Sequence, residues 1–279
     1  MAQKLSTIAL VNGFRFLKNR FQTNYIDQRV IEFLQRFRRL FASSGTNVYI
    51  ATSDGQFRSW EIIRQKIWPL VSDNICGFLL GSSQLGRLRQ FSPAILRNCP
   101  NLRSINSFDL FPEFPAEDNA EASSGQVVAK WLLTPRGDGL PKMLNCPLHS
   151  TGIEGLKRSF RDASESVNFI ISIWHLSTYV IVPFELNNDL TGEQLTFRQI
   201  DKDNWLLVRC PIRREEDKWA KWEKEAIQWS WYRQWNRIDI TFSDRDIGDG
   251  MEQWEDMKQY KEQWENMKQY KEQLEDMKQ

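Results

Sequence analysis

Residues 204–250 read NWLLVRCPIRREEDKWAKWEKEAIQWSWYRQWNRIDITFSDRDIGDG, and the rest of the chain is organised around this stretch. Six of the twelve tryptophans of the chain lie within its first 32 residues. Because one indole can bury a very large apolar area, such a cluster usually marks a core or an interface. The stretch therefore predicts either an aromatic cluster that is buried in a hydrophobic core or an aromatic binding surface.

Periodicity divides this stretch into a strand, a helix and a second strand. The apolar run that starts at Trp205 and ends at Pro211 is typical of a short strand. A helix is predicted over residues 214–228, because acidic residues fill its first turn and its large apolar side chains follow one stripe. The stripe consists of Trp219, Trp222, Ala226 and Trp229. Alternation over residues 235–242 predicts the second strand. We expect the stripe to pack on a sheet; the alternative is an exposed aromatic face.

Before residue 165, strands and helices alternate. Strands are predicted to begin near residues 47, 76, 102, 142 and 167, at separations of 29, 26, 40 and 25 residues. Such alternation gives a mostly parallel sheet with helices on its faces, and the recurring spacing is typical of a leucine-rich-repeat-like solenoid. After residue 165, closely spaced strands predict an antiparallel sheet with the Trp-rich helix across one face. The expected fold is mixed α/β: a strand-helix solenoid, then this antiparallel sheet, then a charged helix at the C-terminus.

The last 29 residues contain an internal repeat with a period of ten: WEDMKQYKEQ (254–263), WENMKQYKEQ (264–273) and LEDMKQ (274–279). Glu, Lys, Gln and Met are good helix formers, so the tail is predicted to be helical. Each repeat turns the apolar stripe by about 80°, at about 100° per residue. This favours a lone solvated helix, and a monomeric chain, over a coiled coil. Three regions are expected: 1–165, 166–250 and 251–279.

Charge is spread unevenly along the chain, whose formal net charge is +1. Residues 1–112 carry 15 Lys and Arg against 6 Asp and Glu, whereas residues 113–250 carry 17 against 22. One interpretation of this pattern is a basic face that binds an acidic partner. The other, which we favour, is a basic surface that is neutralised by the acidic half of the same molecule. No nucleic-acid-binding motif occurs. The sequence also contains no run of 18 apolar residues, the length that a membrane-spanning helix needs. We expect an intracellular protein, cytoplasmic or nuclear, since neither a secretory signal pattern nor a glycosylation sequon is present.

Catalytic and metal-binding patterns are missing from the sequence. The two histidines, His149 and His175, belong to no HExxH, and neither GxSxG nor GxxxxGK[ST] occurs. The four cysteines form no CxxC pair. We therefore expect no enzyme activity, no cofactor, and no catalytic, cofactor-binding or metal-binding residues.

Several short blocks carry a family resemblance. They are DQRVIEFLQRFRRLF (27–41), FRSWEIIRQKIWPLVSDNICGF (57–78), LRQFSPAILRNCPNLRSI (88–105), LFPEFPAEDNA (110–120), NDLTGEQLTFRQIDKDNWLLVRCPI (188–212), EEDKWAKWEKEAIQW (215–229), RQWNRIDI (233–240) and DRDIGDG (244–250). Together they cover roughly residues 25–250. They resemble the C-terminal region of a large family of nematode F-box proteins, with the best match to the sets expanded in plant-parasitic cyst nematodes.

The resemblance implies a role in protein recognition. Members of the family begin with a helical F-box that docks on a Skp1-like adaptor, and the remainder is thought to hold the substrate of an SCF ubiquitin ligase. This chain starts almost at the F-box-associated region, and its tail after Gly250 is unlike the family. We expect a substrate-recognition module that binds an unknown protein and that does not bind a Skp1-like adaptor by itself. The alternative is a self-associating structural protein that uses its C-terminal helical repeat.

Partner-binding residues are predicted on the outward side of the strands. In a solenoid of strand-helix repeats, strand side chains form the binding surface while the helices pack behind. Val48, Leu102 and Ile105 suit the core, which leaves Tyr49, Arg103 and Asn106 outward, and Tyr and Arg are favoured at interface hot spots. Trp231 and Trp235 mark a second candidate region, in the antiparallel half. For each residue, covering a sheet edge is the alternative role.

Overall fold

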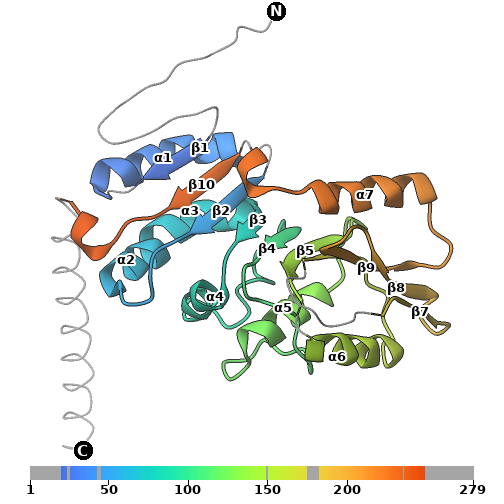
Figure 1. The fold of residues 1–279 in the computed structure, drawn as a ribbon. Helices are drawn as coiled ribbons and strands as arrows, with labels where there is room; N and C mark the ends of the chain where they lie inside the picture. The colour runs from blue at the N-terminus through green and yellow to red at the C-terminus, as the bar shows by residue number, and fades with distance from the viewer. Residues whose placement is uncertain are drawn as a thin grey trace, which may run out of the picture.

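The computed structural model describes residues 20–23, 26–42, 45–148, 150–174, 182–234 and 236–248. These residues form one ten-stranded sheet in the order β1-β10-β2-β3-β4-β5-β6-β9-β8-β7 (Figure 1). The strands are β1 (Arg20–Thr23), β2 (Thr46–Ile50), β3 (Ile75–Leu79), β4 (Ser104–Asn106), β5 (Lys142–Pro147), β6 (Phe169–Trp174), β7 (Phe184–Asn188), β8 (Glu193–Gln199), β9 (Asn204–Pro211) and β10 (Arg237–Ile240). The predicted mixed α/β fold with a mostly parallel sheet is therefore confirmed.

Strands β2 to β6 lie side by side in chain order and are all parallel. They begin at residues 46, 75, 104, 142 and 169, within two residues of the positions that the sequence predicts. The helices between and beside the strands are α1 (Gln28–Ala42), α2 (Phe57–Ile62), α3 (Trp68–Val71), α4 (Ser82–Arg89), α5 (Ser124–Leu132) and α6 (Ser150–Arg161). Each of these six helices contributes to the same buried cluster on one face of the sheet or packs against it.

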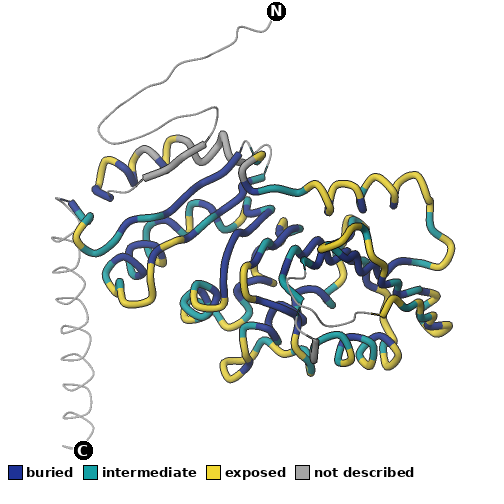
Figure 2. The backbone as a smooth tube through the Cα atoms, viewed as in Figure 1, coloured by how far each residue is buried: buried dark blue, intermediate teal, exposed yellow. Residues whose placement is uncertain are grey.

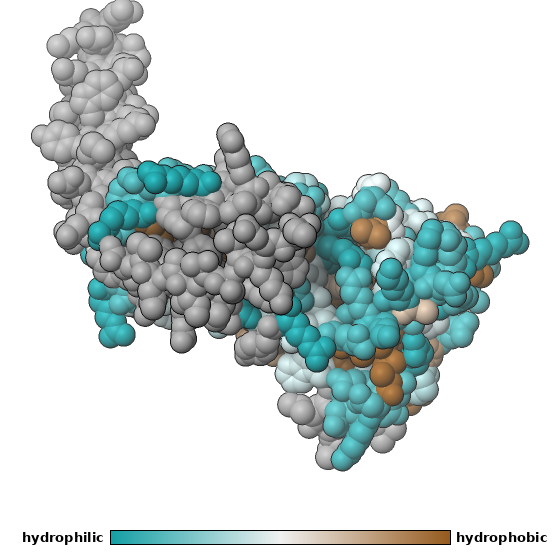
Figure 3. All heavy atoms as spheres, turned by 90° about the horizontal axis from the view of Figure 1, so that it is seen from above, coloured by the Kyte–Doolittle hydropathy of each residue, from teal (hydrophilic) through white to brown (hydrophobic). Residues whose placement is uncertain are grey.

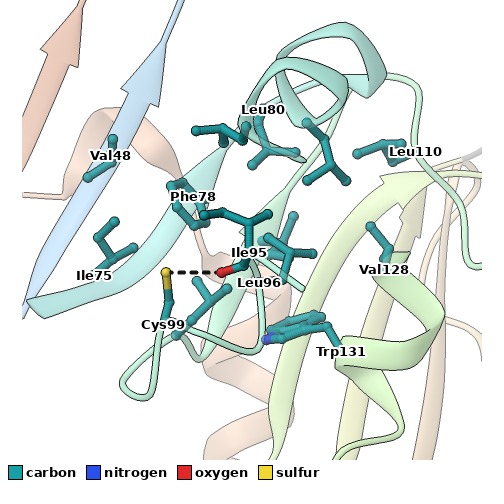
Figure 4. Packing of buried hydrophobic residues seen from close by; sticks show 14 of the residues in the cluster. Val48, Ile75, Phe78, Leu80, Ile95, Leu96, Cys99, Leu110, Val128 and Trp131 are labelled. Atoms are coloured by element: carbon teal, nitrogen blue, oxygen red, sulfur yellow. Dashed lines mark hydrogen bonds between the residues drawn. The ribbon is translucent and has the colours of Figure 1, made fainter. Parts of the chain in front are cut away.

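The main core lies between that face and these helices. Val48, Phe78 and Ile105 point into it from successive strands, because alternate residues of a strand face the same side. Leu96 and Trp131 fill it from the segment before β4 and from α5 (Figure 4). Figure 2 shows the strands buried along most of their length, with exposed residues mainly on the helices and turns.

The second half of the chain differs from the predicted arrangement, because β7, β8 and β9 form no separate antiparallel sheet. β6 pairs in parallel with β5 on one side and antiparallel with β9 on the other. β8 and β7 then extend the same sheet antiparallel to their neighbours. The physical reason lies in β6, where Ile170, Ile171 and Ile173 are all fully buried. A strand with apolar residues on both faces suits the interior of a sheet, with a neighbour along each edge.

β10 is the other departure from the prediction. Its alternating sequence predicts a half-buried strand beside the Trp-rich helix. In the structure β10 lies between β1 and β2, parallel to both, and all four of its residues are buried. Arg237 and Ile238 stand opposite Asn47 and Val48, about 190 residues earlier in the chain. β10 thereby covers an edge of β2 that would otherwise expose unpaired backbone groups.

Some expectations lie outside the described residues: the helical repeat of 251–279, His149, His175 and Trp235. Within the part of the chain that the structure describes, no helix combines the length and the apolar character needed to cross a bilayer.

Candidate partner-binding face

Helix α7 (Glu216–Gln228) lies on the face of the sheet opposite the other helices, and this face is called the α7 face below. Glu216 and Asp217 occupy its first turn, where the helix dipole favours negative charge. Trp219 and Ala226 are buried and Trp222 is half-buried against a second cluster, which strands β5, β6 and β9 supply. The residues of that cluster are Met143, Ile170, Leu206, Val208 and Cys210. The expectation that the Trp stripe packs on the sheet is confirmed for Trp219, Trp222 and Ala226, whereas Trp229 lies beyond the end of the helix.

Ion pairs hold α7 to the sheet along its length. The carboxylate of Glu223, nearly buried, accepts hydrogen bonds from Arg214 at 2.9 Å and from Arg198 at 2.6 Å. Near the other end of the helix, both carboxylate oxygens of Glu225 pair with the guanidinium of Arg103, at 2.8 and 3.0 Å. A two-point Arg–carboxylate contact fixes orientation as well as distance. Arg103, predicted to bind a partner, therefore also joins α7 to the residue that leads into β4.

A pocket of about 420 Å³ opens where the C-terminal end of α7 passes over the first residues of β2, β4 and β5. Asn47, Ser104 and Met143 line it from the strands, and Trp229 and Arg233 line it from the segment after the helix. Arg233 is exposed. The pocket thus combines amide, hydroxyl, aromatic and guanidinium groups, the kind of lining that fixes the orientation of a polar ligand.

An amide network sets the floor of this pocket. Asn47 donates from Nδ2 to Oδ1 of Asn236 at 2.8 Å, and Asn236 donates in turn to the carbonyl of Gly45 at 2.6 Å. The side chain of Asn47 lies across Gly77 of β3, where a Cβ atom would stand only 2.1 Å from Asn47 Oδ1. Gly77 therefore leaves the space that this amide needs.

A row of side chains adjoins the pocket on the same face. Tyr49, Leu79, Asn106 and Asn145 are register neighbours on β2, β3, β4 and β5. Asn106 follows Ser104 by two residues, so it stands on the same face, about 7 Å further along the strand. Tyr49, Asn106 and Asn145 are partly exposed, whereas Leu79 is buried. The row therefore presents two accessible amides beside an aromatic ring.

The structure brings three of the five predicted residues together. Arg103 lines the pocket, and Tyr49 and Asn106 belong to the row beside it. Trp231 is only 5 % exposed and packs edge-on against Tyr49, with ring centroids 5.9 Å apart, so it supports the site from beneath the surface. Trp235 lies outside the described residues.

Sequence reasoning missed Asn145 and the Asn47–Asn236 pair. Asn145 could have been found, because Leu144 and Cys146 are apolar and alternation then places Asn145 on the other face. The pairing of Asn47 with Asn236 had no signal in the sequence, since it depends on β10 lying next to β2.

The charge asymmetry of the sequence is partly neutralised within the molecule. Arg97 pairs with Asp118 and Arg103 pairs with Glu225, so basic residues of the first part of the chain meet acidic residues of the second. This supports the interpretation of the basic half as a surface matched by the acidic half. On the side of the molecule that Figure 3 shows, the coloured residues are mostly hydrophilic, with separate hydrophobic patches. Polar recognition fits such a surface better than docking through one large apolar patch.

Comparisons with protein-family models, with curated protein sequences and with solved structures found no match to this chain. Among the described residues, no three His, Cys, Asp or Glu side chains are grouped so that they could hold a metal ion.

Proposed function

We propose that this chain is a non-enzymatic protein-interaction module that binds a partner protein on its α7 face. The observation that carries the proposal is the row of Tyr49, Asn106 and Asn145, partly exposed on three rigid strands beside the 420 Å³ pocket. A carboxamide both donates and accepts hydrogen bonds, so two neighbouring asparagines can pair with the main chain of a bound segment. The aromatic ring of Tyr49 adds contact area at a low cost in conformational entropy.

Within this proposal, the strand-helix half is a leucine-rich-repeat-like solenoid. Support comes from β2 to β6, which are neighbours in chain order at separations of 29, 29, 38 and 27 residues. Helices α1 to α6 stay on one face, so strand side chains of the other face are left for a partner. The insertion of β10 before β2 then closes one end of the solenoid.

The F-box resemblance suggests what kind of partner to look for. In that family the region after the F-box is thought to hold the substrate of an SCF ubiquitin ligase. We propose that residues 20–248 serve this substrate side, in the cytoplasm or nucleus, and that they do not themselves bind a Skp1-like adaptor or nucleic acid.

Replacing Asn106 with arginine is expected to weaken partner recovery at least about tenfold, a loss of about 1.4 kcal/mol in binding. A long charged side chain at this position removes the amide and intrudes on the row, while its end can reach water from a half-buried site. The measurement is quantitative proximity labelling in cells that express each variant. Circular dichroism and thermal melting check that the fold is intact.

Asn187→Arg is the matched control, because Asn187 is exposed on β7, on the same face of the sheet but at its far edge. It should leave recovery unchanged. Equal recovery for the parent chain and for a folded Asn106→Arg variant would place the binding surface elsewhere.

A further inference from the structure

Lys142 is a buried lysine on the side of the sheet that the α7 face does not include. It begins β5, and only 5 % of the residue is exposed. Its Nζ donates to the carbonyl oxygens of Trp131 and Thr134, at the C-terminal end of α5, the second at 2.6 Å. The same nitrogen lies 5.1 Å from the centroid of the Trp131 ring. Lysines are almost never buried without a charged partner, so this placement calls for an explanation.

The amine stands at the wall of a pocket of about 370 Å³. Trp131 and Lys142 form one side, and Arg97, Arg136 and Asp138 contribute the charged part of the lining. Figure 4 shows the Trp131 ring next to Leu96 and close to Cys99, which lie on the same pocket. A space of this size holds a small organic molecule.

The charged groups around the amine do not stabilise its protonated form. Burial, together with the positive charges of Arg136 and Arg97, lowers the pKa of Lys142 from 10.5 to about 7. Asp138 is engaged by Arg136 through two hydrogen bonds, at 2.9 and 2.6 Å, and Asp118 is engaged by Arg97. Burial raises the pKa of the Cys99 thiol to about 12, so this thiol brings no negative charge at neutral pH.

The hydrogen-bond geometry also accommodates a neutral amine. Such an amine has two N–H bonds and one lone pair, and the carbonyls of Trp131 and Thr134 accept from two N–H bonds. The lone pair is then the group left to react. A lysine whose amine is neutral and desolvated is the type that forms Schiff bases with carbonyl compounds.

We propose that Lys142 is a covalent binding site for a small carbonyl compound that carries a carboxylate, such as an α-keto acid or an aldehyde acid. The Nζ lone pair attacks the carbonyl carbon, and the carbonyl oxygen takes a proton to give a carbinolamine. Nitrogen then loses its proton as water leaves, and an imine remains. One amine and one carbonyl give one imine and one water, with no change in oxidation state. The guanidinium groups of Arg97 and Arg136 on the pocket wall complement the carboxylate of the ligand.

The test is reductive trapping on the intact chain. The protein is incubated with glyoxylate and cyanoborohydride at about pH 7.5, and the lysines are quantified by peptide mass spectrometry. An ordinary lysine, with a pKa near 10.4, is almost fully protonated there. Lys142 should therefore be labelled at least about tenfold faster than exposed Lys202. Its labelling rate should rise with pH to a plateau with a midpoint near 7. Labelling of Lys142 no faster than of Lys202, or a midpoint near 10, would overturn the proposal.

A second arm tests the carboxylate. Acetaldehyde, which has none, should label Lys142 more slowly than glyoxylate, and Arg97→Gln should reduce this preference. Equal rates for both probes on the parent protein would contradict the anionic class of ligand. The parent protein alone decides both arms, so a poorly folded variant does not remove the test.

Discussion

Replacing Glu193 with glutamine should lower the free energy of unfolding by about 3–5 kcal/mol, because it leaves a buried charge without its partner. The side chains of Glu193 and Arg209 are only 1 % and 2 % exposed, and Arg209 Nη2 lies 2.6 Å from Glu193 Oε2. The other carboxylate oxygen accepts the backbone N–H of Val167 at 2.8 Å, and Arg209 also donates to the carbonyl of Glu165. The pair therefore joins β8 and β9 to the segment that leads into β6.

Urea unfolding followed by circular dichroism measures the effect. Glu185→Gln is the control, because Glu185 is exposed on the neighbouring strand β7, and its loss should change stability by less than about 0.5 kcal/mol. If Glu193→Gln and Glu185→Gln unfold at the same urea concentration, the ion pair does not hold these strands together.

Trp219→Ala should destabilise the protein by about 3–5 kcal/mol, the usual cost of removing a large buried aromatic side chain. Trp219 is 4 % exposed, packs with Met143, Ile170 and Leu206, and carries the guanidinium of Arg214 at 5.5 Å from the centre of its ring. Loss of this indole removes the main apolar contact between α7 and the sheet.

Trp222→Ala is the matched comparison on the same helix. Trp222 meets Trp219 edge-on at 5.3 Å but is only half-buried, so its truncation should cost distinctly less. Thermal melting of both variants decides the order. An equal or reversed order would mean that the stripe is not seated on the sheet through Trp219.

Local periodicity was enough to predict much of this fold. The spacing of Trp219 and Ala226 identified the buried stripe of α7, and alternation found the starts of β2 to β6 within two residues. Both patterns involve only residues that are close together in the sequence, so they can be recognised without knowing which distant segments pair in the fold.

Pairing between distant segments was beyond the reach of such patterns. Arg237 and Asp239 in β10 have the charge expected of a solvent-facing edge, yet both are buried, 3.4 Å apart as an ion pair. Arg237 also lies over the ring of Trp231 at 5.5 Å and donates to its carbonyl. The alternation of charged and apolar residues is the same whether the charged side chains face water or pack against an indole and a counter-ion. The sequence therefore could not reveal where β10 lies.

For the candidate site, too, the sequence predicted the local features and missed the contacts between distant segments. Alternation placed Tyr49 and Asn106 away from the main core, because each follows an apolar neighbour within one strand, and both lie on the α7 face. The contact of Tyr49 with Trp231, and of Arg103 with Glu225, joins segments more than 100 residues apart. Tyr49 and Arg103 were predicted to bind a partner, and through these contacts they also stabilise the α7 face.

Site-specific photocrosslinking shows whether a partner protein docks on the α7 face. A photoreactive benzoylphenylalanine replaces Asn106 in one protein and Asn187 in another, and each is irradiated in cells that express the chain. We expect a crosslinked partner protein from position 106 and none from position 187, since both lie on one face but Asn106 follows the pocket residue Ser104 by two positions, whereas Asn187 lies on the far edge strand β7. Crosslinks from position 187 alone, or from neither position while the partner still co-purifies, would contradict the proposal.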